Sequence, residues 1–192
     1  MDKSVPTSAT VNFPEKEQTQ VDKFVNDTRV AYNCSKSQFL MMGIAWVLPC
    51  ERKLFNMFPE VICVDTTQDT NNEERPLLTI SAKDTHGKMF TVLRAYLPNE
   101  QTWVFHWVFS NVLPSMFGNS ILKHIKMVIS DGDSQEYSQL DNAINRFFPS
   151  VYRGRCGWHI IEKGWQIHML GVKSFPVESA AFYYNLVHHL KA

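Results

Sequence analysis

Apolar and polar residues alternate in three consecutive runs, which cover residues 60–67, 75–83 and 89–98. This alternation is typical of β-strands that bury one face and expose the other. Between the second and third runs, the polar stretch Asp84–Gly87 carries the turn residues of a β-hairpin. The pattern therefore predicts three consecutive strands in an antiparallel meander.

Beyond Pro98 the apolar residues recur at helical spacing. Asn99 is a candidate N-cap of this helix, and Gly118 is a candidate stop. Strands and helices then alternate: a strand over 125–134, a helix over 136–148, a short strand over 151–156, and a further helix that begins at Gly157.

The predicted element order is β-β-β-α-β-α-β-α, which belongs to the α/β class. A three-stranded meander followed by alternating helices and strands is the ribonuclease-H-like pattern. We therefore expect a mixed five-stranded sheet flanked by helices, in which the first and fourth strands lie side by side.

The region before the meander has a different composition. Residues 1–20 are polar, contain two prolines and show no periodicity, which predicts a disordered leader. Residues 21–57 show partly helical spacing and are expected to form a helical or strand extension. Within them the apolar stretch 39–49 is too short to span a bilayer, so we expect a buried strand or helix there.

Composition limits the possible classes of protein. The chain has 192 residues, 44% of them hydrophobic, which is enough for one sizeable core. Nineteen basic and nineteen acidic residues balance, so the total charge does not indicate nucleic acid, although a local patch remains compatible with it. Four cysteines without close paired spacing, and no leading apolar segment, favour reduced intracellular thiols.

Two aspartates carry the candidate chemistry. Asp65 ends the first predicted strand and Asp131 ends the fourth, so neighbouring strands would bring the carboxylates to one sheet edge. Two such carboxylates repel each other unless a divalent cation, Mg²⁺ or Mn²⁺, lies between them. Two cations there support two-metal phosphoryl transfer. The alternative is that both are turn-forming residues satisfied by backbone amides, which suits Asp69 and Asp133 well.

Cys156 and His159 form a second candidate cluster. Three residues apart at a helix start, they would lie on one face and could reach one metal ion. No second Cys/His pair is close in sequence, so the pair is at most half of a zinc site, and we do not expect Zn²⁺. Alternatively, His159 points into the active site to position water or phosphate, while Cys156 packs as a small hydrophobe.

An aromatic cluster lies in the predicted helix after Pro98. Its members, Trp103, Phe105, Trp107 and Phe109, could stack on bases. Aromatic residues at helical spacing more often belong to a core, and we favour the core for Trp103 and Trp107.

Five segments together resemble a known family in their order and spacing. They are "DTTQDTN" at 65–71, "DTHGK" at 84–88, and the longer stretches 99–118, 128–151 and 156–160. The set resembles the transposase domain of Mutator-like elements (MULE). The resemblance covers 58–165, and 166–192 would begin the helical insertion of that family, apparently truncated.

The resemblance implies a DDE-type nuclease and strand transferase of ribonuclease-H-like fold. It implies Mg²⁺ or Mn²⁺ as cofactor, the ends of a DNA transposon as partner, a possible homo-oligomer, a nuclear location and no membrane. Carried over to this chain, Asp65 is the first catalytic acid and Asp131 the second. Cys156 and His159 match the C-x-x-H pair of the family, and His159 is counted among the catalytic candidates.

One departure from the family pattern concerns the third acid, a glutamate that lies well downstream. After His159 the chain offers only Glu162 and Glu178, which are better interpreted as solvated helix residues. We therefore expect a truncated transposase, or alternatively a non-catalytic, domesticated DNA- or protein-binding regulatory module that keeps the fold. An unrelated hydrolase or nucleotide-binding domain lacks support, because no nucleophile elbow or phosphate-binding glycine loop is present.

Overall fold

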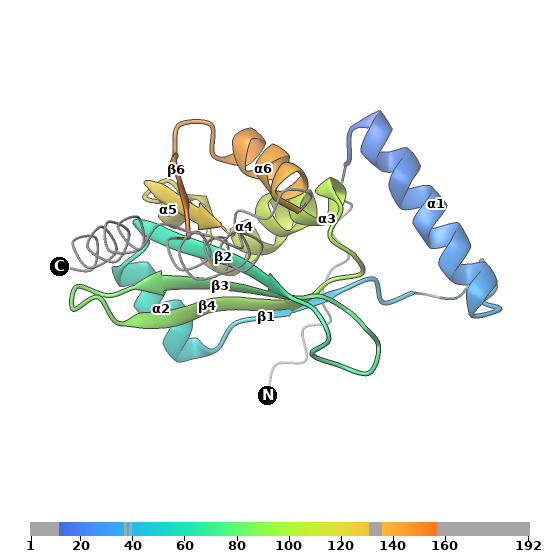
Figure 1. The fold of residues 1–192 in the computed structure, drawn as a ribbon, viewed down its shortest axis with the longest axis horizontal. Helices are drawn as coiled ribbons and strands as arrows, with labels where there is room; N and C mark the ends of the chain where they lie inside the picture. Colours follow the sequence, from blue (N-terminus) through green and yellow to red (C-terminus); the bar gives the residue numbers. More distant parts are fainter. Residues whose placement is uncertain (1–11, 37, 39, 131–135, 157–192) are drawn as a thin grey trace, which may run out of the picture.

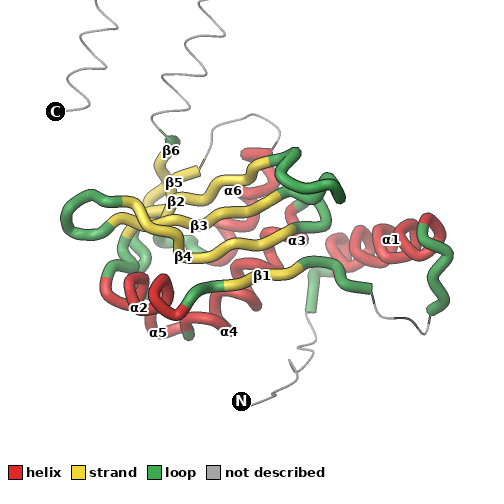
Figure 2. The backbone as a smooth tube through the Cα atoms, turned by 90° about the horizontal axis from the view of Figure 1, so that it is seen from below, coloured by secondary structure: helices red, strands yellow, loops and turns green. Residues whose placement is uncertain are grey.

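The protein contains one mixed sheet of six strands. The computed structural model describes residues 12–36, 38, 40–130 and 136–156. The strand order is β1-β4-β3-β2-β5-β6, as Figure 2 shows from below. The strands are β1 (Ile44–Trp46), β2 (Val61–Thr67), β3 (Leu77–Lys83), β4 (Met89–Tyr96), β5 (Met127–Ser130) and β6 (Tyr152–Arg155).

The predicted meander is confirmed. β2, β3 and β4 pair antiparallel in sequence order, and β2 pairs with β5 in parallel. The first and fourth predicted strands therefore lie side by side, and with β6 they complete the expected five-stranded ribonuclease-H-like sheet. The sixth strand is β1, which adds to the edge of β4.

Seven helical segments accompany the sheet in the described part of the chain. They are α1 (Glu15–Ala31), α2 (Pro49–Met57), α3 (Thr102–Trp107), the π-helix η1 (Val108–Val112), α4 (Leu113–Phe117), α5 (Asn119–Leu122) and α6 (Glu136–Phe147). In Figure 1 α1 extends away from the sheet, and Figure 2 shows α3 to α6 behind it.

Two expectations about the N-terminal region are wrong. α1 begins at Glu15, so the last six residues of the predicted leader are helical. Pro14 starts the helix because its φ of −56° and ψ of 152° suit the position before the first turn. In the apolar stretch 39–49 the described strand is β1, which lies at the sheet edge and is not buried, since its Ile44 is 47% exposed.

The predicted long helix after Pro98 is also corrected at its start. It begins at Thr102 with Gln101 as N-cap, whereas Asn99 accepts a hydrogen bond from the Gln101 amide at 3.1 Å in a preceding turn. The helix continues through η1, where the Leu113 amide donates to the Val108 carbonyl. Gly118 ends it as predicted, with φ at +78°.

The core fills the space between one face of the sheet and the helices. Alternate strand residues such as Ile62, Ile80 and Val128 are buried together with residues of α3 and α6. The aromatic cluster belongs to this core, because Trp103, Phe105 and Phe109 are at most 4% exposed and Trp107 packs against them. The preference for core packing over base stacking is therefore confirmed for the tryptophans.

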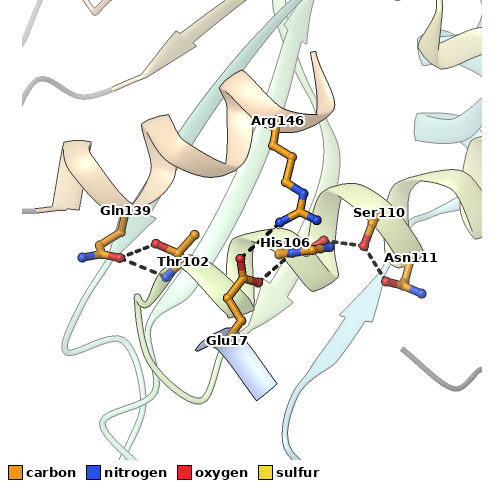
Figure 3. Close-up of polar contacts among 7 residues, drawn as sticks. All are labelled: Glu17, Thr102, His106, Ser110, Asn111, Gln139 and Arg146. Carbon is orange, nitrogen blue, oxygen red and sulfur yellow. Dashed lines mark hydrogen bonds and ion pairs between the residues drawn. The ribbon is translucent and has the colours of Figure 1, made fainter. Parts of the chain in front are cut away.

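A buried polar cluster holds α1 against the domain (Figure 3). Glu17 of α1 lies 2.7 Å from Nδ1 of His106 in α3, and both side chains are nearly buried, at 13% and 6% exposure. Glu17 also lies 3.5 Å from Arg146 of α6. Rings of Phe13 and Phe147 flank the imidazole, with centroids 5.5 and 4.7 Å away. One carboxylate therefore ties three helices together.

Candidate active site

The carboxyl ends of β2, β4 and β5 meet at one edge of the sheet. β2 and β4 both run antiparallel to β3, and β5 runs parallel to β2, so all three strands point the same way. The described register of β2 and β5 ends with the pair Val64 and Ser130. These residues immediately precede Asp65 and Asp131 in the sequence, and Asp131 itself lies outside the described residues.

Asp65 is a strand residue rather than a turn residue. It is the fifth of seven residues of β2 and pairs with Thr79 of β3, so the strand continues two residues past it. Within the described part of the chain, the hydrogen bond to its carboxylate comes from the Thr67 hydroxyl at 3.3 Å. The alternative of a turn former satisfied by backbone amides is therefore wrong for Asp65.

Asp84 shows what a turn-forming aspartate looks like in this protein. Its Oδ1 accepts hydrogen bonds from the backbone amides of His86 and Lys88, each at 2.8 Å. It lies in the β3–β4 hairpin, at the opposite end of these strands from the carboxyl end of β2. By contrast, no backbone amide of the described residues donates to the Asp65 carboxylate, which accepts a hydrogen bond from the Thr67 hydroxyl.

Glu100 is an acid at the same edge that was not among the predicted site residues. It lies between β4 and α3, and its Oε2 accepts a hydrogen bond from the Gln68 side-chain amide at 2.9 Å. Its other oxygen, Oε1, is buried and has no hydrogen-bond partner among the described residues. Its position in the sequence, between a strand and a helix at the edge that carries Asp65, is the signal that could have identified it.

The start of α3 at this edge is held by α6. Oε1 of Gln139 accepts a hydrogen bond from the backbone amide of Thr102 at 3.2 Å, and it also contacts the Thr102 hydroxyl (Figure 3). After Gln68 the chain turns at Asp69, which adopts a left-handed φ of +57° that aspartate tolerates. The Gln139 contacts therefore hold the start of α3, two residues after Glu100.

The second candidate cluster is only partly described. Cys156 follows β6, and its amide donates to the Ser130 carbonyl at 2.9 Å, so it extends the strand ladder. His159 lies outside the described residues. No group of three or more His, Cys, Asp or Glu side chains suited to a metal ion occurs in the described ranges. The Cys156–His159 pair therefore stays a prediction.

Cys63 lies on β2 two residues before Asp65. Burial raises the pKa of its thiol, nearby Cys156 raises this pKa further, and Lys83 opposes them. A raised pKa keeps the thiol protonated at neutral pH, when it is neither a strong nucleophile nor a ready metal ligand. Cys63 is therefore a packing residue of the strand.

The buried histidine does not form a nucleophile–base pair. The Ser110 hydroxyl donates to the backbone carbonyl of His106 at 2.7 Å, not to its ring, and it also contacts Asn111 (Figure 3). Because the imidazole is enclosed by α1, α3 and α6, it is a structural residue of helix packing.

The sheet order, with an acid on the central strand β2 at the carboxyl edge, defines a ribonuclease-H-like α/β domain. The family model described as "MULE transposase domain" matches residues 61–163, which is more than half of the chain. The chain therefore belongs to the family of MULE transposase domains.

The chain is also similar to a solved structure, the HTLV-2 integrase catalytic core domain in complex with magnesium, in its trimeric form. The identity is 12% and the TM-score 0.32, over 63% of this chain and 78% of that one. No curated protein matches the chain. In the ranges that the structure describes, no helix has the length and apolar character needed to cross a membrane.

Proposed function

We propose that this domain is the catalytic core of a transposase that cleaves DNA and transfers its strands with Mg²⁺ or Mn²⁺. Asp65 and Asp131 would hold the cation. The observation that carries the proposal is the parallel register of β2 and β5, which pairs Val64 with Ser130, the residues just before the two acids. The substrate would be the ends of a DNA transposon, in the nucleus.

The residues at the carboxyl edge fit a hard divalent cation. Asp65 offers carboxylate oxygens that accept no hydrogen bond from a backbone amide of the described residues, and Glu100 has a buried oxygen without a partner in the same residues. Carboxylate oxygens are the ligands that Mg²⁺ and Mn²⁺ prefer. Such ions, when bound, activate the attacking oxygen and stabilise the leaving oxygen of a phosphodiester.

The contribution of the protein is to position these groups. Asp65 pairs with Thr79 of β3, and the residue before it, Val64, pairs with Ser130 of β5, so the sheet fixes the backbone at this point. The Thr67 hydroxyl orients its carboxylate. Rigid placement is what phosphoryl transfer requires, because the reacting oxygens must be aligned and held close together.

The test is nicking of supercoiled plasmid DNA by the purified chain with Mg²⁺ or Mn²⁺, and with EDTA as the cation-free control. We expect Asp65→Asn and Asp131→Asn each to lower the nicking rate roughly 100-fold or more. Asp84→Asn is the matched control, because its amide oxygen can still accept the hairpin hydrogen bonds far from this edge. DNA binding without cation-dependent nicking would favour a regulatory module and contradict the proposal.

A further inference from the structure

We propose that Glu100 is a third carboxylate ligand of the cation that Asp65 holds. This inference rests on the proposed function and extends it to a residue outside the expected pair. It locates a third acid of the site in the connection between β4 and α3.

The backbone brings Glu100 to the correct edge. β2 and β4 are separated by one strand, and Asp65, Thr79 and Arg94 pair in one row across the sheet. Glu100 follows β4 where that strand leaves the sheet, at the carboxyl edge. The Gln68 amide, three residues after Asp65, reaches across to Glu100 Oε2 at 2.9 Å. The segments that follow β2 and β4 are therefore joined by the hydrogen bond between Gln68 and Glu100.

The second observation is the unsatisfied oxygen. Glu100 Oε1 is buried and lacks a hydrogen-bond partner among the described residues. A carboxylate oxygen removed from water without a partner is costly, and native proteins rarely keep one without a reason. A divalent cation is a suitable partner for this oxygen, because such cations bind carboxylate oxygens and this edge carries a further acid, Asp65.

Asp141 Oδ1 is also buried without a hydrogen-bond partner among the described residues, but it forms an ion pair with Arg153. The three acids whose side chains are 10–16% exposed each contact a basic group: Glu17 with His106, Glu51 with Arg94, and Asp141 with Arg153. Within the described residues Glu100 contacts no basic side chain, and the hydrogen bond that it accepts there comes from a neutral amide. The arrangement leaves the negative charge of Glu100 available to a cation.

The experiment measures Mn²⁺ binding by calorimetry and by thermal unfolding of the full chain. Wild type should bind Mn²⁺, and its melting temperature should rise with the cation. Glu100→Gln, which keeps the shape and removes the charge, should weaken Mn²⁺ binding roughly tenfold or more. The matched control is Glu73→Gln, because Glu73 is an exposed acid in the connection between β2 and β3.

The variant Asp65→Asn distinguishes a failure of the proposed role of Glu100 from a failure of the proposed function. If Asp65→Asn abolishes Mn²⁺ binding while Glu100→Gln binds within twofold of wild type, the role of Glu100 is overturned and the proposed function stands. If wild type binds no Mn²⁺, both are overturned. Without cation, Glu100→Gln should melt at or above the wild-type temperature. A decrease of more than about 5 °C would mean that the carboxylate already has a protein partner, and would also overturn the inference.

Discussion

Removal of the Glu17 carboxylate should weaken the attachment of α1 to the rest of the domain. In Glu17→Ala, the imidazole of His106 loses a contact at 2.7 Å in a nearly buried environment. Arg146 loses a longer contact at 3.5 Å, but its side chain is 51% exposed and can be solvated by water. The effect should therefore come mainly from His106.

The size of the effect follows from these two contacts. A hydrogen bond that involves a charged group contributes about 1.5–3 kcal/mol. The pair with the half-exposed arginine adds less than about 0.5 kcal/mol after solvent screening. We expect Glu17→Ala to lower the free energy of unfolding by about 2–3 kcal/mol, which corresponds to a melting temperature about 4–12 °C lower for a chain of this length.

The assay combines thermal unfolding with amide hydrogen exchange along α1. Glu15→Ala is the matched control, because Glu15 lies in the same first turn and is exposed. It should cost no more than about 1 kcal/mol, through the helix dipole. In Glu17→Ala the α1 amides should exchange faster than in wild type, while exchange in the core strands changes less. A melting temperature equal to that of Glu15→Ala, with unchanged exchange in α1, would show that the Glu17–His106 contact does not hold α1 against the domain.

Three further predictions concern residues outside the proposed cation site. Burial raises the pKa of the Cys63 thiol, so its alkylation by iodoacetamide should require a higher pH than that of a free cysteine. Exposed Cys50 should be alkylated first, and equal rates for the two thiols would contradict this. Gly118→Ala should cost about 1–3 kcal/mol in urea unfolding, because φ of +78° and ψ of 148° suit glycine almost alone. Asp84→Ala should cost roughly 1–2 kcal/mol through the lost hairpin contacts, with Mn²⁺ binding unchanged.

The meander was predictable because its signal is local. Alternation over 60–98 reflects burial of one face of each strand, and the Asp84–Gly87 turn separates two of the strands. The neighbouring positions of β2 and β5 followed from the element order, and the Val64–Ser130 pair confirms them. The element order is therefore sufficient to predict the sheet edge that carries Asp65.

Other features depend on contacts that the local pattern does not contain. The start of α1 resembled a polar leader because residues 1–20 are polar, contain two prolines and show no periodicity, yet Glu17 has a partner, His106, that lies 89 residues away. Glu100 is a single acid in a connection, and only tertiary packing shows that one of its oxygens is buried. Asn99 resembles an N-cap, but it caps the preceding turn and leaves that position to Gln101.

The most direct test of the central claim is the anomalous diffraction of a crystal of the full chain soaked in Mn²⁺. We expect a Mn²⁺ peak at the carboxyl edge of the sheet, at about 2.0–2.3 Å from carboxylate oxygens of Asp65 and Asp131. A well-ordered edge with both carboxylates free of metal, or turned away from each other, would contradict the proposal that this edge is a catalytic cation site.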